Sequence, residues 1–453
     1  MIHQAIQHYH DLLVGGLAEE THQQVMETQR KNRLYFGQTP VCRVLRPHFY
    51  TTDAWRYLQV RTALILTAFR KIHDALMEDS TMRAQLDLEP YEEEMLHVDK
   101  DAGFKTPWTS SRLDSFYRPD TGYLRFVEYN AETPAGIGYG DGLTDMFLNL
   151  EVMRRFQKRY NVRGTPGMTH LTNSIVRGYR EWGGKVEKPM IAVVDWATVA
   201  TKNEHYISKE VFERAGYPSM VTEPEAMTYR DGGLYVEDTK IDIIYKRVLC
   251  TELVHKLGMQ TDIVRAVRAG AVFMTNSFSA KPLAKKASLA VLSDEHNAHL
   301  FTPEELDAVH AHIPWTRRVQ DRKTAYEGQE IDLLSWISAN KQKLVVKPND
   351  EYGGSGVIIG WETDQTGWDS AIRHALTTPH VVQERVLTVE RDFPMMIDGR
   401  LDISKRYVDA DPYVYYGERV EGCLTRLSGS ALLNVTAGTG SVVPMFVVEP
   451  IEP

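Results

Sequence analysis

The segment that most constrains how this chain can fold is residues 108–136, WTSSRLDSFYRPDTGYLRFVEYNAETPAG. Two of its runs alternate between apolar and polar residues, and the turn-forming residues RPDTG separate them, so the segment predicts a β-hairpin. Successive side chains of a strand point to opposite faces, so the first strand presents Arg112 and Asp114 together. The side chains expected on one face of the second strand are Leu124, Phe126, Glu128 and Asn130.

A turn centred on Thr121 places Asp114 opposite Glu128 and Arg112 opposite Asn130. Directly opposed residues have Cβ atoms about 4.5–5.5 Å apart, so two facing carboxylates repel each other unless a cation lies between them. Carboxylate and amide oxygens are the ligands of hard cations such as Mg²⁺. The hairpin therefore predicts a magnesium site formed by Asp114, Glu128 and Asn130. An ordinary exposed strand is the alternative, and a register shifted by one residue would remove the pairing.

Composition limits the class of protein. A chain of 453 residues with 43% hydrophobic and 25% charged residues is typical of a soluble globular protein of about two to four structural units. The net charge of −9, with no basic stretch to offset it, argues against a nucleic-acid partner. The three cysteines are far apart and form no CxxC pair, and the sequence shows neither a signal peptide nor an apolar run of membrane-spanning length. We therefore expect a cytoplasmic protein that does not contact a membrane.

Hydrophobic periodicity divides the chain into four segments of a mixed α/β protein. Residues 1–107 have helical spacing, and residues 108–185 contain the hairpin and two further helices. Residues 186–265 begin with the buried strand PMIAVVDW and continue with a helix and more strands, which predicts a small Rossmann-like module without a GxGxxG motif. Residues 266–453 are rich in strands and contain a glycine-rich loop.

That glycine-rich loop, in KLVVKPNDEYGGSGVIIGW, follows a buried strand that ends on Lys347. Glycines permit positive φ and remove side chains, so backbone N–H groups of such a loop can close over phosphates. The motif is not a Walker A sequence, because no GK[ST] opens a helix. The lysine at the strand end favours nucleotide binding over a plain glycine-rich hairpin. The residues at the expected tip of the loop are Gly353, Gly354, Ser355 and Gly356.

Three further segments carry weaker signals. In VVQERV, Glu384 is a candidate for the ribose hydroxyls of a nucleotide, with Gln383 and Val386 nearby. Lys286 in AKKASLAVL is a candidate second phosphate lysine at a helix start, and Arg426 in CLTRLSG is a candidate for an anionic group. TAGTGSVV offers a second glycine loop. Taken alone, each also fits an ordinary strand end or an exposed surface.

Taken together, several motifs of this chain resemble the ATP-grasp synthetase domain of glutathionylspermidine synthase. They are R-x-D…E-Y-N-A-E-T-P, K-A-x-L, V-V-K-P…G-G-S-G, Q-E-R-V and a late arginine. More broadly, they resemble the circularly permuted ATP-grasp proteins related to it. E-x-N-x-x-x-P is similar to the last metal motif of ordinary ATP-grasp ligases, where it follows the lysine and the glycine loop. Here it precedes them, and a circular permutation produces this order. The resemblance extends from about residue 35 to the end of the chain and implies a circularly permuted ATP-grasp fold.

The resemblance also implies roles for individual residues. Asp114, Glu128 and Asn130 would hold Mg²⁺. Arg112 would stabilise the phosphoryl-transfer or tetrahedral intermediate, and Arg426 would lie near the acceptor carboxylate. The residues that would bind ATP, through its phosphates, ribose or adenine, are Lys286, Lys347, Gly353, Gly354, Ser355, Gly356, Gln383, Glu384 and Val386.

The implied activity is that of an ATP-dependent carbon–nitrogen ligase, which joins a carboxylate to an amine through an acyl phosphate. The expected substrates are small molecules such as an amino acid, a peptide or a polyamine. Glu132, Asp141 and Asp145 are expected in a solvated loop, with contact to an amine substrate as the alternative. A phosphotransferase or nucleotide-dependent regulator on the same fold remains an alternative to the ligase. A monomer and a homodimer are both compatible with the sequence.

Overall fold

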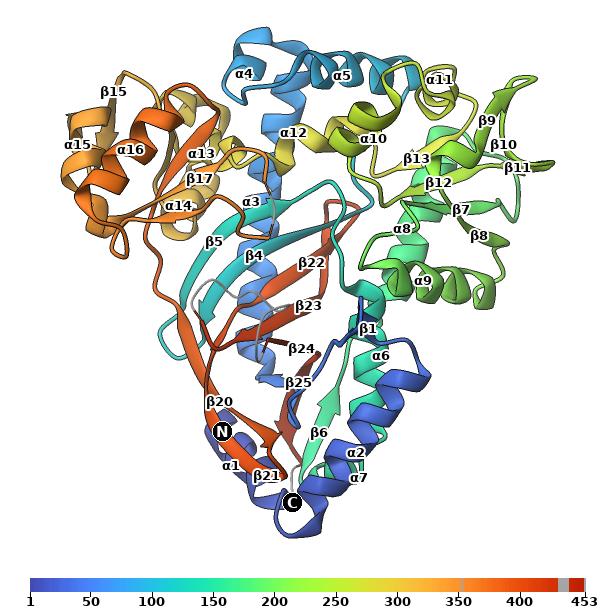
Figure 1. Cartoon of the computed structure of the whole chain (residues 1–453), viewed down its shortest axis with the longest axis vertical. Coiled ribbons are helices and arrows are strands. Elements are labelled where there is room, and N and C mark those ends of the chain that lie inside the picture. The colour runs from blue at the N-terminus through green and yellow to red at the C-terminus, as the bar shows by residue number, and fades with distance from the viewer. Residues whose placement is uncertain (352, 431–439, 452–453) are drawn as a thin grey trace.

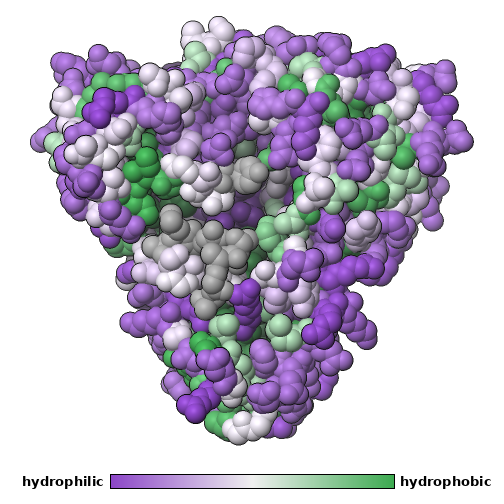
Figure 2. All heavy atoms as spheres, in the orientation of Figure 1, coloured by the Kyte–Doolittle hydropathy of each residue, from purple (hydrophilic) through white to green (hydrophobic). Residues whose placement is uncertain are grey.

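A computed structural model of the chain describes residues 1–351, 353–430 and 440–451. A central antiparallel sheet lies between two upper lobes and a lower lobe, and the lower lobe carries both termini (Figure 1). Figure 2 shows that the face in view is largely hydrophilic and is hollowed between the two upper lobes. The elements that border this hollow come from distant parts of the sequence.

The central sheet has seven strands in the order β20-β21-β23-β22-β4-β5, with β24 paired to β23. All of its strand pairs are antiparallel. The predicted hairpin is β4–β5, and it forms one edge of this sheet. The bounds of the strands are β4 Ser110–Arg118, β5 Tyr123–Asn130, β20 Val389–Ile397, β21 Arg400–Val408, β22 Asp411–Tyr415, β23 Arg419–Ser428 and β24 Ser441–Val443.

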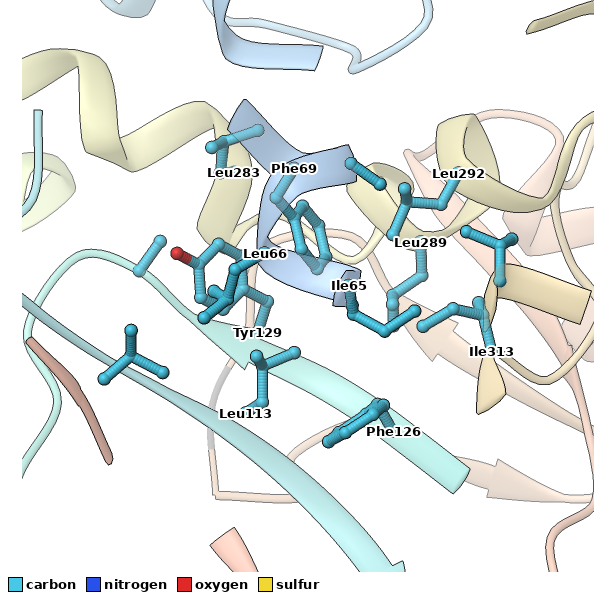
Figure 3. Close-up of a cluster of buried hydrophobic side chains, with 14 of the residues drawn as sticks. Ile65, Leu66, Phe69, Leu113, Phe126, Tyr129, Leu283, Leu289, Leu292 and Ile313 are labelled. Carbon is cyan, nitrogen blue, oxygen red and sulfur yellow. The ribbon is translucent and has the colours of Figure 1, made fainter. Parts of the chain in front are cut away.

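Helix α3 (Thr52–Glu78) covers one face of the hairpin. At about 1.5 Å per residue, its 27 residues extend for about 40 Å. Leu66 and Phe69 of α3 lie among Phe126 and Tyr129 of the hairpin, and all four are buried (Figure 3). This core fixes which face of the hairpin remains open to the site. The helices that complete the cover are α12 Lys281–Ala284, α13 Ala287–Ser293 and α14 Pro303–His312.

The upper lobe drawn in gold and orange contains a small antiparallel sheet in the order β14-β19-β17-β18 (Figure 1). Its core includes Leu344, Val346 and Trp368, which are fully buried. The glycine-rich loop connects β17 to β18. The bounds are β14 Thr316–Arg318, β15 Lys323–Tyr326, β16 Gln329–Asp332, α15 Leu333–Ala339, β17 Leu344–Pro348, β18 Ile358–Ile359, α16 Gln365–Ala375 and β19 His380–Glu384.

The green upper lobe contains a four-stranded parallel sheet in the order β13-β12-β7-β8, beside a three-stranded sheet β11-β10-β9 (Figure 1). Strand β7 (IAVV) is buried along its whole length, as expected for a parallel strand covered on both faces. The bounds are β7 Ile191–Val194, β8 Ser219–Thr222, β9 Met227–Arg230, β10 Gly233–Val236, β11 Thr239–Ile241, β12 Ile243–Lys246, β13 Phe273–Thr275, α5 Pro90–Ala102, α8 Gly167–Trp182, α9 Lys202–Arg214, α10 Cys250–Leu257 and α11 Asp262–Arg268.

The lower lobe joins the two ends of the chain. Strand β25 lies between β3, to which it is parallel, and β6, to which it is antiparallel. The short hairpin β1–β2 lies above this sheet, near helix α6. The bounds are α1 Ile2–Leu12, α2 Gly16–Lys31, β1 Tyr35–Phe36, β2 Thr39–Pro40, β3 His48–Tyr50, α6 Ile137–Leu148, α7 Glu151–Phe156, β6 Tyr160–Arg163 and β25 Met445–Pro450. Helix α4 (Ser80–Ala84) lies at the opposite, upper end of the molecule (Figure 1).

Candidate active site

The residues predicted to bind a metal lie on the two strands of the hairpin. Strands β4 and β5 pair Arg112 with Asn130 and Asp114 with Glu128, which confirms both predicted pairs. Nearer the turn, Arg118 pairs with Tyr123, so the turn is centred between residues 120 and 121. The side-chain amide of Asn130 donates a hydrogen bond of 2.9 Å to Oδ1 of Asp114. These two polar side chains therefore share one face of the hairpin.

A β-bulge changes the remainder of the second strand. Ser115 pairs with Phe126, so Val127 is an extra residue between two paired positions. One extra residue reverses the alternation of side chains along a strand. Leu124 and Phe126 therefore lie in the core under the helices, with no exposed area, whereas Glu128 lies on the opposite face. The prediction that all of these side chains share one face was wrong, because the bulge gives this strand a core end and a site end.

Asp114 lies at the centre of a cluster of charges. Its carboxylate accepts hydrogen bonds from Nε and Nη2 of Arg112, at 2.7 and 3.1 Å, and from Nη2 of Arg426 at 2.8 Å. Burial by itself raises the pKa of this carboxyl, but the two guanidiniums outweigh burial and hold the pKa below its ordinary value. Asp114 is therefore an anion that holds both predicted catalytic arginines.

Two aspartates that the sequence analysis did not single out hold Arg426 from its other side. Asp409 accepts hydrogen bonds from Nε of Arg426 at 2.5 Å and from its backbone N–H at 2.6 Å, and Asp411 lies 3.1 Å from Nη2. Burial raises the pKa of Asp409, and it raises the pKa of Asp411 well above its ordinary value. The D-x-D pattern in YVDADP, between two strands, is the sequence signal that would have found them.

Both predicted phosphate lysines lie beside the hairpin. Nζ of Lys286 is 3.2 Å from Oε1 of Glu128 and also donates to the backbone carbonyl of Glu351. Nζ of Lys347 donates to Oε1 of Gln383 at 2.6 Å. Desolvation lowers the pKa of Lys347 to about 8, although the nearby Glu128 raises it. A metal ligand predicted on one strand and a phosphate lysine predicted far along the chain thus form an ion pair.

The first residues of the glycine-rich loop contact the start of helix α13. The carbonyl of Asn349 accepts a hydrogen bond of 2.9 Å from the backbone N–H of Lys286, and its Oδ1 accepts one of 2.8 Å from Ala287. The next residue, Asp350, forms an ion pair with the buried Lys281. The base of the loop is therefore fixed to the helix that carries one of the lysines.

The tip of the loop is exposed and shaped by glycine. Gly353, Gly354 and Gly356 have φ values of 65°, 77° and 68°, in the left-handed region that other residues rarely adopt. Ser355 is exposed between them. Of the second glycine loop predicted in residues 436–443, residues 436–439 lie outside the described ranges.

The three residues predicted to line the adenine and ribose occupy different surroundings. Gln383 is buried and accepts a hydrogen bond from Lys347, so it holds a predicted phosphate lysine in place. Glu384 is half-buried, and its Oε1 accepts a hydrogen bond of 3.0 Å from the hydroxyl of Tyr326. Val386 packs against the small cluster formed by Phe116 of the hairpin and Val389. This segment therefore follows the border between the small antiparallel sheet and the hairpin.

The expectation of a solvated loop was wrong for Glu132. This carboxylate is 3% exposed, lies 3.1 Å from Nζ of Lys246 and 3.7 Å from Nζ of Lys281, and accepts a hydrogen bond of 2.6 Å from the backbone N–H of Cys250. Burial raises its pKa, but the two lysines outweigh burial and lower the pKa to about 2. Glu132 therefore fixes the loop that follows the predicted metal motif to the parallel sheet.

The same expectation was wrong for Asp141, which accepts hydrogen bonds from the backbone N–H groups of Gly167 and Met168, at 2.8 and 2.9 Å. Burial raises the pKa of Asp141 to about 6. Asp145 is exposed, but it lies on helix α6 and not in a loop.

The donors on the open face of the hairpin fit a divalent cation. The side chain of Glu128 is 29% exposed, with Lys286 beside it. Asn130 turns its amide nitrogen toward Asp114, and among the described residues no hydrogen-bond donor reaches its amide oxygen. A carboxylate and an amide oxygen suit Mg²⁺. The oxygens of Asp114 are already engaged, so coordination by Asp114 would replace one of its hydrogen bonds.

A family profile described as "Circularly permuted ATP-grasp type 2" matches residues 89–428. The matched region contains the hairpin, both lysines, the glycine-rich loop and Arg426, in the permuted order. The chain belongs to this family. Membership of the circularly permuted ATP-grasp type 2 family confirms the expected fold and supports the expected enzyme class, an ATP-dependent ligase.

Curated proteins similar to this chain include one from Mycobacterium tuberculosis and one from Frankia alni. An uncharacterized protein of Mycobacterium tuberculosis is 23% identical over 343 residues, which cover 72% of this chain and 58% of the relative. The "Putative glutamate--cysteine ligase 2-3" of Frankia alni is 26% identical over 243 residues, which cover 51% of this chain and 26% of the relative. The chain thus spans little more than half the length of the first relative.

One solved structure shares the fold along nearly the whole chain. It is a glutathione synthetase-like effector from Globodera pallida in its apo form, with a TM-score of 0.56 and 8% sequence identity. The match covers 95% of this chain and 97% of that one.

Among the helices in the described ranges, none has the length and apolar character needed to cross a membrane.

Proposed function

We propose that this chain is an ATP-dependent carboxylate–amine ligase that forms an amide through an acyl phosphate. The observation that carries the proposal is the 3.2 Å ion pair between Glu128 and Lys286. It joins the predicted metal motif to the predicted phosphate lysine, although the two are far apart in the sequence. The ATP-grasp family membership supports the same assignment.

The nucleotide side of the site neutralises and encloses the triphosphate. Lys286 and Lys347 supply positive charge beside the hairpin, and the loop 349–356 supplies backbone N–H groups. Phosphoryl transfer depends on positioning and charge neutralisation more than on covalent chemistry by the protein. Mg²⁺ held by Glu128 and Asn130, with Asp114 beside them, would further neutralise the phosphate charge.

The acid side of the site contains the two arginines held by Asp114. A carboxylate oxygen of the acid attacks the γ-phosphorus, and ADP leaves. The amine nitrogen then attacks the acyl carbon and loses a proton, and inorganic phosphate leaves as the amide forms. Negative charge develops beside Arg112 and Arg426 in both steps, and their fixed positions suit its stabilisation.

The finer resemblance to glutathionylspermidine synthase makes a peptide one candidate acid and a polyamine one candidate amine. The name of the Frankia relative supports amide formation by an amino-acid ligase as a second substrate class. We further propose a cytoplasmic enzyme, because all three cysteines are buried as free thiols.

The proposal is tested by incubating the full chain with MgATP and panels of amino acids, peptides, other carboxylic acids and polyamines. ADP, phosphate and an amide should appear together, and the amide should be detected by mass spectrometry. ADP and phosphate without an amide, in every combination, would refute the ligase. Transfer of phosphate to a stable acceptor would establish the phosphotransferase alternative.

A further inference from the structure

A cavity of about 180 Å³ lies beside the two arginines. Arg112 and Arg426 belong to its lining, so the cavity adjoins the place where the acid would react. The remaining lining is mainly apolar. The apolar and aromatic side chains that contribute to it are Phe36, Pro40, Val41, Tyr139, Leu424 and Val442.

The arginines retain donors for an anion. Within the described ranges 1–351, 353–430 and 440–451, Nη1 of Arg426 has no hydrogen-bond acceptor, and the side chain is 25% exposed. Arg112 uses three of its five N–H groups, two on Asp114 and one on the carbonyl of Ala135. A carboxylate at this end of the cavity could therefore receive charge-assisted hydrogen bonds without breaking the cluster around Asp114.

The start of helix α6 also lies at the cavity, but its donors are already used. Oε1 of Glu204 accepts hydrogen bonds from the backbone N–H groups of Gly136 and Gly138, at 2.8 and 3.0 Å. An added Cβ at Gly136 would lie 2.6 Å from the hydroxyl of Tyr413, so this backbone passes close to its neighbours. Among the described lining residues, the arginines are therefore the charged donors left for a carboxylate.

We infer that this cavity selects the acid substrate, and that it takes a carboxylic acid with a compact apolar side chain. The carboxylate would lie against Arg426 and Arg112, and the side chain would lie against Phe36, Leu424 and Val442. An apolar cavity of about 150 Å³ is large enough to bind benzene, so about 180 Å³ holds a single aromatic ring or a branched aliphatic chain.

Part of the selective wall comes from outside the region that the family profile matches. Phe36, Pro40 and Val41 precede residue 89, and Val442 follows residue 428. These residues belong to the β1–β2 hairpin region and to strand β24. The cavity is thus shaped by segments of this chain beyond the common ATP-grasp part, which suits a feature that sets substrate choice.

The inference rests on the proposed function for its reaction, but binding can be measured without turnover. The probes are 4-methylpentanoate and 3-phenylpropionate, with 4-methylpentanol as the match that lacks the carboxylate and glutarate as the match with a polar end. Calorimetry on the full chain should show at least tenfold weaker binding of 4-methylpentanol and of glutarate than of 4-methylpentanoate. Equal binding of glutarate would overturn the inference.

Variants locate the binding. Val442→Phe should reduce the affinity for 3-phenylpropionate at least tenfold, because the larger ring fills the cavity, while ATP affinity should stay unchanged. Val162→Phe, at a half-buried valine of strand β6 that does not line the cavity, is the matched control and should leave both affinities unchanged. Phe36→Ala enlarges the cavity and should shift the preference toward 4-phenylbutanoate. Unchanged acid affinities in both Val442→Phe and Phe36→Ala would refute the cavity as the site.

The two proposals fail in different ways. If apolar acids bind with the expected preference but no amine yields an amide, the ligase proposal falls and the acid site stands. If amides form but the enzyme prefers glutarate or peptides to apolar acids, the acid site falls and the ligase stands.

Discussion

Replacing Glu132 by Gln keeps the shape of the side chain and removes its charge from between Lys246 and Lys281. The pKa of Glu132 is lowered from 4.5 to about 2, and one pKa unit corresponds to about 1.4 kcal/mol, so the ionised carboxylate contributes about 3 kcal/mol to folding. Removing one partner of a buried ion pair typically costs about 3–5 kcal/mol, which agrees. We therefore expect Glu132→Gln to lower the free energy of unfolding at pH 7 by about 3 kcal/mol.

Urea unfolding of the two proteins, followed by circular dichroism between pH 7 and pH 2.5, measures this difference. A carboxyl whose pKa is lower in the folded state stabilises the fold above its unfolded pKa and loses that contribution as the pH falls through the folded pKa. The difference between Glu132→Gln and the wild type should thus be full above about pH 4.5 and should decrease toward pH 2.

Glu128→Gln is the matched control, because the same motif supplies a glutamate with one lysine beside it and 29% of its side chain exposed. Exposed or half-exposed ion pairs contribute about 0–1 kcal/mol, so this variant should unfold almost as the wild type does. Equal stability of Glu132→Gln and Glu128→Gln at pH 7, or a difference that stays constant down to pH 2.5, would refute the assigned role of Glu132.

Three further predictions concern ATP. Glu128→Gln should abolish Mg²⁺-dependent ATP turnover while circular dichroism stays unchanged, and retained turnover would contradict the metal assignment. Gly354→Val should weaken ATP binding in calorimetry at least tenfold, because φ of 77° strains valine and because the side chain would keep the backbone N–H groups of the loop away from the phosphates; unchanged affinity would count against the loop as a phosphate lid. Because Lys347 loses its proton above about pH 8, ATP affinity should fall as the pH rises through 8, and Lys347→Arg should remove this dependence.

The hairpin shows how much of the structure can be predicted from residues that are close in the chain. The predicted pairing of Asp114 with Glu128 is observed, but the bulge contributes to it: the turn pairs Arg118 with Tyr123, and the extra residue in the second strand brings Glu128 opposite Asp114. The bulge at Val127 was missed, because one extra residue in a strand leaves no compositional signal. The four proposed segment boundaries stay predictions.

The partners of the charged residues around the site could not be predicted from the sequence. Glu128 and Glu132 are four residues apart in one motif, yet one is half-exposed and the other is buried between lysines from other elements. Asp409 and Asp411 acquire their role only because β22 and β23 bring them to Arg426. Such partners depend on tertiary packing, so a pattern along the chain does not distinguish them.

The pairing of strand β4 with strand β22 has a consequence for how the chain is made. Arg112 pairs with Tyr413, so the inner edge of the β4–β5 hairpin stays without its neighbour until synthesis has reached the last part of the chain. At about 5–20 residues per second, this takes roughly 15–60 s on the ribosome. An unpaired strand edge invites pairing with other chains during that time. Helix α3 is made before the hairpin and can cover its apolar face at once, so the permuted order leaves a hydrogen-bonding edge exposed to the cell rather than an apolar surface.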